Sequence, residues 1–239
     1  MIAILKKELN AFFSTPIGYL VIAVFLGLNG LFLWVFDGDF NILNTGFADL
    51  NGFFYLAPWI FTFLIPAITM RMFSDEYAIG TIEILKTKPL SLWQIIFGKY
   101  FAALILIIFS IVPTLVYVYS IGSLGNPANN FDLGSLLGSY IGLLFLASTY
   151  IAIGLYTSTL SKNQITTFII GVCLSLFLYS GFDAMDSLFG NLEYTVQKTG
   201  MSAHFKSLAR GVIDTRDLIY FLSISGFFLV LTKFRLERA

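Results

Sequence analysis

Six long apolar stretches dominate this sequence and constrain its fold more than any other feature. Each holds about 17 to 25 largely uncharged residues, the length that lets a helix cross the ~30 Å hydrocarbon core of a bilayer. Inside lipid every backbone polar group must be satisfied within the protein, so such stretches form transmembrane helices. We therefore predict a single all-α integral membrane domain over residues 1–239, with spans at about 16–36, 53–73, 98–121, 136–160, 165–182 and 218–234.

Composition excludes several other classes of protein. Hydrophobic residues make up 57% of the chain and charged residues 12%, whereas soluble domains average about 25% charged. With a formal net charge of zero, neither a disordered chain nor a basic nucleic-acid binder fits, so we expect no nucleic-acid partner. The single cysteine, Cys173, excludes an internal disulfide and a thiolate metal cluster. We expect Cys173 to be a small buried apolar side chain, and the lone His204 argues against a histidine metal site.

The distribution of charge predicts the orientation of the chain. Six spans place both termini on one side of the membrane. With the N-terminus inside, the inner segments carry ten of the fourteen cations and five of the fourteen acids, and the outer segments carry the rest. This excess of inner cations predicts cytoplasmic termini in a bacterial inner membrane. One outer segment departs from the pattern, because it holds all four outer cations: Lys198, Lys206, Arg210 and Arg216.

The first fifteen residues have the pattern of an amphipathic helix lying at the membrane interface. Its apolar side is predicted to hold Ile2, Leu5, Leu9, Phe12 and Phe13, and its polar side Lys7, Glu8 and Asn10. Ile4 does not fit this pattern. No small-x-small cleavage site follows the apolar run, which disfavours a cleaved signal peptide. Pro16 is expected to open the first span, at a helix position that tolerates proline.

The longest outer segment, residues 183–217, shows two runs with helical spacing. One run is formed by Leu188, Leu192 and Val196, and the other by Phe205, Leu208, Ala209 and Val212. We predict two short outer helices before the last span, the second N-capped by Ser202 and ending near Gly211.

The inner segment between Arg71 and Lys99 is the only sizeable inner loop in this arrangement. Its residues Asp75 to Lys86 predict a short helix with acids near its beginning and a lysine near its end. Gly80 and Thr81 form a small patch that another surface could approach closely. Ser91 and Gln94 have the spacing of a capping box before the third span. From this pattern alone, an ordinary interfacial loop helix stays an alternative.

This inner segment resembles the loop after the second span of type-2 ABC exporter permeases. The matching elements are Glu76, Gly80-Thr81, Ile82-Glu83, Leu85, Pro89-Leu90-Ser91 and Gly98-Lys99. The resemblance extends to the order of the interfacial helix, the six spans and the long last outer loop. Within the family, the sequence looks most like the gliding-motility-associated branch, the GldF permeases of Bacteroidota.

The resemblance implies a non-catalytic membrane subunit. In the family the short inner helix is a coupling helix that sits in a groove of a separate ATPase. It implies ATPase-coupling roles for Asp75, Glu76, Gly80, Thr81, Glu83 and Leu85. It also implies a GldA-like ATPase partner that binds ATP and Mg²⁺, and a second membrane subunit that is GldG-like or a second copy of the chain. The 239 residues contain no Gly-x4-Gly-Lys-Ser/Thr phosphate loop, so we expect no cofactor bound by this chain.

Three glycines, Gly134, Gly138 and Gly142, recur every fourth residue at the start of the fourth span. Such small-residue spacing lets helices approach closely within lipid. The stripe predicts either a contact between subunits or, as the favoured interpretation, packing inside one subunit.

The span centres hold no acid or base in this sequence. This pattern disfavours an ion-coupled transporter and a charge-lined channel. It favours an ATP-driven permease for a large amphipathic or lipid-linked substrate. The alternative is an intramembrane scaffold or mechanical-coupling module that an ATPase drives without solute transport. An intramembrane enzyme is disfavoured because no Ser/His pair or buried carboxylate pair is apparent.

Overall fold

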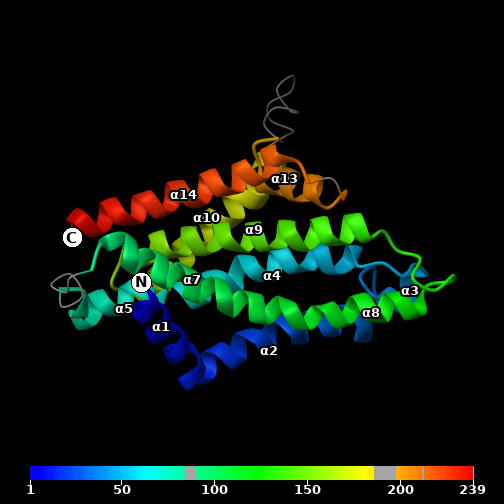
Figure 1. Cartoon of the computed structure of the whole chain (residues 1–239), viewed down its shortest axis with the longest axis horizontal. Helices are drawn as coiled ribbons and strands as arrows, with labels where there is room; N and C mark the ends of the chain where they lie inside the picture. The colour runs from blue at the N-terminus through cyan, green and yellow to red at the C-terminus, as the bar shows by residue number, and fades with distance from the viewer. Residues whose placement is uncertain (84–89, 186–197, 212, 239) are drawn as a thin grey trace.

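The computed structural model describes residues 1–83, 90–185, 198–211 and 213–238, which fold into helices without a strand (Figure 1). Six of these helices are long and apolar enough to cross a membrane. The protein is therefore an all-α, multi-pass integral membrane protein. The six spans are Pro16–Val35, Asn51–Ile79, Leu92–Leu124, Leu133–Ser158, Gln164–Ala184 and Thr215–Arg238.

The first three spans are built from consecutive helical segments. Helix α1 (Ile2–Ser14) precedes α2 (Pro16–Gly30), which begins at Pro16 as predicted and continues as a wider turn over Leu31–Val35. The second span joins α4 (Asn51–Thr69) to α5 (Arg71–Ile79), and the short α3 (Ile42–Thr45) precedes it. The third joins α7 (Leu92–Ile111) to α8 (Leu115–Leu124) through a tight turn at Pro113.

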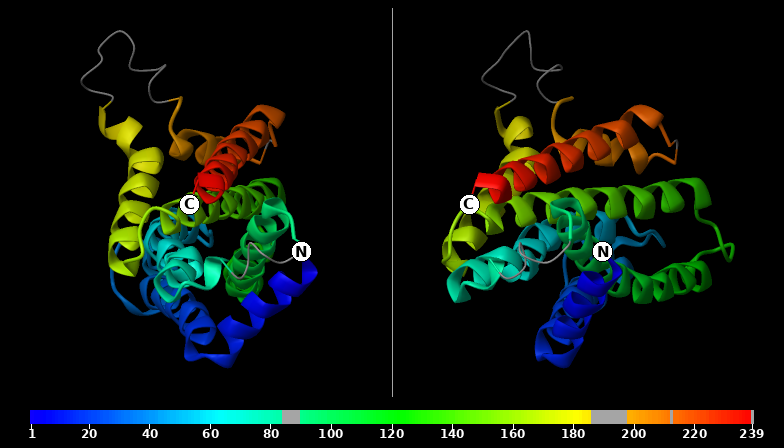
Figure 2. Two further views of the ribbon diagram at one scale, coloured as in Figure 1. Left: turned by 90° about the vertical axis from the view of Figure 1, so that its left-hand side faces the viewer. Right: turned by 60° about the vertical axis from the view of Figure 1, so that its left-hand side comes forward.

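The remaining spans are α9, α10 and α14. Helix α9 (Leu133–Ser158) is the centre of the bundle and packs against α4, α7, α10, α13 and α14. Helix α10 (Gln164–Leu176) continues to α11 (Phe182–Met185). Helix α13 (Met201–Leu208) lies beside α9, and α14 (Thr215–Arg238) ends the chain. Figure 2 shows α9 between α14 on one side and α4 and α7 on the other, with α2 beyond these two.

Both chain termini and the C-terminal end of α5 lie at the same end of the bundle, on the left in Figure 1. We call this the termini end. The loop that joins α8 to α9 lies at the other end, with α3. This arrangement agrees with an even number of membrane crossings.

The face of α1 that packs on the bundle matches the predicted one only in part: Phe12 is buried and Leu9 and Phe13 pack partly buried on the core, as predicted. Ile4, Glu8 and Phe12 are its buried residues, and Ile2 is exposed. Ile4, which did not fit the amphipathic pattern, packs on α7 at Gly98. A Cβ added at Gly98 would lie 2.9 Å from the Cβ of Ile4, so a glycine there lets α1 and α7 approach closely.

The predicted helix over Asp75–Lys86 is interrupted in the structure. Helix α5 ends at Ile79 because Gly80 takes a left-handed conformation with φ of 78°, as glycine does at helix ends. Residues 81–83 are helical again, and residues 84–89, including Leu85, lie outside the described residues. Because α5 continues α4 as far as Ile79, the second span covers Asn51–Ile79 and is longer than the predicted 53–73. The predicted capping box of Ser91 and Gln94 is present and opens α7 at Leu92.

Two further predictions on single residues are wrong. The Cys173 side chain is exposed on the surface of this chain rather than buried, because it lies on the outward side of α10. Ser202 does not cap α13, which has Gly200 at its N-cap; the Ser202 hydroxyl instead donates to Asp183 at 2.6 Å. The predicted helix at Leu188, Leu192 and Val196 lies outside the described residues, as does Val212.

The glycine stripe of α9 faces α13 of the same chain. A Cβ added at Gly138 would lie 2.2 Å from the carbonyl oxygen of Leu208, and one at Gly142 would meet Phe205 and Leu208 at 3.2–3.3 Å. Gly134 faces the backbone of Gly211. The stripe therefore seats the short helix that precedes the last span.

Candidate functional site at the termini end

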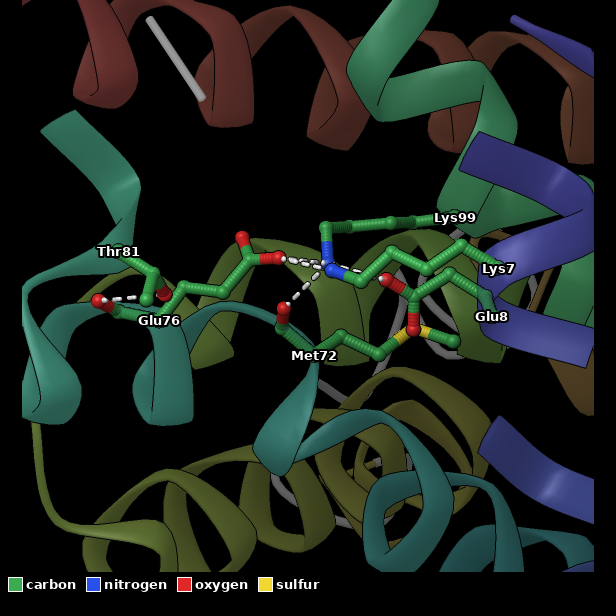
Figure 3. A network of polar contacts seen from close by, with 6 residues as sticks. All are labelled: Lys7, Glu8, Met72, Glu76, Thr81 and Lys99. Atoms are coloured by element: carbon green, nitrogen blue, oxygen red, sulfur yellow. Dashed lines mark hydrogen bonds and ion pairs between the residues drawn. The ribbon is translucent and has the colours of Figure 1, made fainter. Parts of the chain in front are cut away.

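The site begins with a lysine that is buried in the bundle. Lys99 lies in the second turn of α7, and its side chain is only 1% exposed. Its ammonium nitrogen Nζ lies 2.8 Å from Glu8 Oε1, 2.9 Å from Glu76 Oε1 and 2.7 Å from the carbonyl oxygen of Met72 (Figure 3). A buried ammonium is costly unless it is paired and hydrogen-bonded. Here all three of its donors have an acceptor.

The partners of Lys99 come from three separate segments. Glu8 belongs to α1, Met72 and Glu76 belong to α5, and Lys99 belongs to α7. Lys7 of α1 adds a second cation, 3.0 Å from Glu76 Oε1 and 3.5 Å from Glu8 Oε1. The cluster thus pairs two carboxylates with two ammonium groups, so its charges balance. It ties the N-terminal helix and the end of the second span to the beginning of the third.

The charge of Lys7 is stable over the physiological range. Partial burial lowers the pKa of Lys7, but the hydrogen bond to Glu76 and the two nearby carboxylates outweigh this effect, and the pKa is raised above 10.5. Because the folded-state pKa is the higher one, the stabilisation is fully present below pH 10.5 and is lost only above it. Lys7 therefore gives the cluster no switch near neutral pH.

The exposed end of α5 lies next to this cluster. Ile79 is 75% exposed, and the following residues Gly80, Thr81 and Glu83 are exposed as well. Ile82 between them is buried and packs on the core. The turn is therefore exposed at Ile79 and held to the protein core by Ile82. A cavity of about 350 Å³ lies between this turn and α1.

The structure divides the predicted coupling residues into two groups. Gly80, Thr81 and Glu83 lie on the exposed turn. Asp75 and Glu76 lie on the inward side of α5: Asp75 accepts a hydrogen bond from Gln164 at the start of α10, and Glu76 is 8% exposed and paired with Lys99. The carboxylate of Glu76 is therefore held inside this chain.

Comparison with known protein families decides the class of this membrane protein. The model of the ABC-2 family of transporter proteins matches residues 3–225. This match covers α1, the first five spans and the beginning of α14. The chain belongs to the ABC-2 family of transporter proteins. No curated protein matches it. Members of the ABC-2 family are membrane components of transporters, which agrees with six spans in one bundle.

Sequence reasoning did not find the Lys99 cluster of this ABC-2 chain. Glu8 is 91 residues from Lys99 and Glu76 is 23 residues away, so no local spacing joins them. One feature of the sequence does point to the cluster. Lys99 follows Gly98 in the segment that resembles type-2 ABC exporter permeases, and it lies at the beginning of an apolar span. A lysine at that depth either reaches back to the interface or needs carboxylate partners within the bundle.

Proposed function

We propose that this chain is the permease subunit of an ATP-driven exporter, and that a separate ABC ATPase docks on the exposed turn at the end of α5. Membership of the ABC-2 family supports the permease role. The observation that carries the docking site is the position of Ile79, Gly80, Thr81 and Glu83. They form an exposed turn at the end of a membrane-spanning helix. Beneath them, Asp75 is held by a hydrogen bond from Gln164 and Glu76 by ion pairs with Lys99 and Lys7.

The second span gives this turn a direct connection to the membrane. Helices α4 and α5 form one continuous span from Asn51 to Ile79. A movement of the ATPase that displaces the turn therefore displaces the end of a long helix, and this helix packs along the central helix α9. The Lys99 cluster joins α5 to α1 and α7, so we propose that these helices move together when ATP closes the ATPase pair.

The finer assignment rests on the sequence pattern. We propose a gliding-motility-associated complex in which this GldF-like chain works with a GldA-like ATPase, which binds ATP and Mg²⁺. The second membrane subunit is GldG-like or another copy of this chain. The charge distribution supports cytoplasmic termini in the inner membrane. The apolar span interiors support an amphipathic or lipid-linked substrate.

Co-purification with a matched pair of variants tests the docking site. Ile79 and Phe47 are 75% and 73% exposed. Ile79 ends α5 and Phe47 follows α3 by two residues, and these two helices lie at opposite ends of the bundle (Figure 1). Neither side chain supports the core, so Ile79→Asp and Phe47→Asp should both fold. We expect Ile79→Asp to reduce recovery of the ATPase with the tagged chain, and Phe47→Asp to leave it unchanged. Equal recovery in both variants would refute the docking site.

Transport in vesicles separates the permease from the mechanical alternative. Reconstituted complex should move an amphipathic substrate only when ATP is hydrolysed. ATP hydrolysis that depends on this chain but moves no lipid or solute would favour a mechanical-coupling module instead.

A further inference from the structure

The last outer loop collects cations where the rest of the outer sequence avoids them. In the structure, all four of its cations, Lys198, Lys206, Arg210 and Arg216, line one cavity of about 620 Å³. The cavity lies between α11, α13 and the beginning of α14. The four cations that depart from the charge distribution of the other outer segments thus lie around one cavity. The ATPase docking proposed above does not use it.

The wall of this cavity is fixed by packing and hydrogen bonds. Helix α13 sits on the glycine stripe of α9, and the hydroxyl of Ser135 donates to the carbonyl of Ala209 at 2.6 Å. His204 Nδ1 lies 2.6 Å from Asp217 Oδ1, and the His204 ring stacks on Tyr220 with centroids 3.8 Å apart. These contacts hold α13 to both α9 and α14, so the cavity is built by ordered elements.

Each acid of the cavity has one oxygen engaged by another group, while Asp183 Oδ1 and Asp217 Oδ2 have no hydrogen-bond partner among the described residues. Asp217 is buried and pairs with His204. Asp183 accepts from Ser202 at 2.6 Å and lies 3.5 Å from Lys206. Asp214 accepts from the backbone N–H of Arg216 at 2.8 Å, an interaction that leaves the Arg216 side chain unused.

The two arginines are exposed and available. Within the part of the chain that the structure describes, neither Arg210 nor Arg216 has a side-chain hydrogen bond or ion pair. Both arginines line the cavity, and neither guanidinium group is paired with Asp183, Asp214 or Asp217. Guanidinium groups match the oxygens of phosphate and carboxylate in a two-point geometry. The cavity is therefore suited to an anionic oxygen ligand.

We propose that this cavity binds a phosphate group through Arg210 and Arg216, with Lys206 adding positive charge. Arg216 lies at the beginning of a membrane span, the level at which headgroup phosphates occur. The same helix exposes Ile219 and Leu222 one and two turns further along. A phosphate site beside an exposed apolar helix face suits a phospholipid, which has a phosphate headgroup and apolar chains. Free inorganic phosphate could bind the same arginines through its charged oxygens.

Binding measurements on the full chain in detergent test this proposal. The variant Arg210→Gln/Arg216→Gln removes both guanidinium groups, which are exposed and make no hydrogen bond or ion pair with any described residue. Its matched control, Arg235→Gln/Arg238→Gln, removes two exposed arginines from the other end of α14. The probes are phosphatidylglycerol, counted per chain by native mass spectrometry, and inorganic phosphate, followed by calorimetry.

We expect saturable binding to the wild type and the control. Because a hydrogen bond to a charged group contributes strongly, we expect the Arg210→Gln/Arg216→Gln variant to bind at least about tenfold more weakly than the wild type. Saturation by phosphatidylglycerol alone would identify the ligand as a lipid headgroup, and saturation by both probes would identify phosphate itself. The proposal is overturned if neither probe saturates, or if the Arg210→Gln/Arg216→Gln variant binds with wild-type affinity.

Discussion

Replacing Lys99 by methionine tests the buried ion cluster most sharply. Methionine keeps most of the lysine stem but removes the ammonium, so Glu8 and Glu76 lose their buried partner and keep only Lys7, whose side chain is 59% exposed. The carboxylates would remain buried, and Glu76 Oε2 already has no hydrogen-bond partner among the described residues. Removing one partner of a buried ion pair costs about 3–5 kcal/mol. We expect Lys99→Met to lower the free energy of unfolding by an amount in this range.

Lys233→Met is the matched control for this experiment. Lys233 is partly exposed, pairs with Glu237 at 3.2 Å and lies 5.6 Å from the centre of the Trp93 ring; pairs near the surface contribute about 0–1 kcal/mol. Thermal unfolding in detergent, followed by size-exclusion chromatography, should therefore separate the two variants clearly. Neutralising the acids as well, in Lys99→Met/Glu8→Gln/Glu76→Gln, should recover much of the loss. Equal melting of Lys99→Met and Lys233→Met would refute the reasoning.

Two glycine substitutions test the close contacts and the turn. Gly138→Ala would place a Cβ 2.2 Å from the Leu208 carbonyl, so we expect it to displace α13 and cost about 1–3 kcal/mol in thermal unfolding. Gly226→Ala on α14 meets no atom within 4 Å and should cost nothing; equal effects would contradict the α9–α13 contact. Gly80→Ala forces a left-handed backbone on alanine, so about 1 kcal/mol of local strain should weaken ATPase recovery. Gly80→Asn, which tolerates this conformation better, should recover more ATPase, and identical recovery in the two variants would argue against the turn.

The sequence predicts the membrane-spanning part of the fold well, because hydropathy is a local property. At each of the six predicted positions lies a helix long and apolar enough to cross a membrane, and the first helical position of Pro16 and the capping box of Ser91 are confirmed. The errors concern the direction that single residues face. Glu8 was assigned to the polar side of a surface helix, yet it faces the bundle because Lys99 is there to neutralise it.

The candidate site depends on contacts between distant segments and was only half predictable. The local pattern indicated Gly80–Thr81 as a small patch within a continuous helix over Asp75–Lys86, but not the turn at which Gly80 ends α5. The inward position of Glu76 follows from Lys99 on another helix, which no spacing within residues 71–83 reveals. Likewise the outer cations were visible as an exception to the charge pattern, and only the packing of α13 on α9 shows that they share a cavity.

Site-specific photocrosslinking at Ile79 tests the central claim most directly. A photoreactive amino acid placed at this exposed position in the full chain, in cells, should form a crosslink to a nucleotide-binding subunit. The same group at Phe47, which is 73% exposed and follows α3 at the other end of the bundle, should not. A crosslink to an ATPase at Ile79 alone is the result that our account predicts. Crosslinks from Ile79 only to lipid, or to an ATPase from both positions, would contradict it.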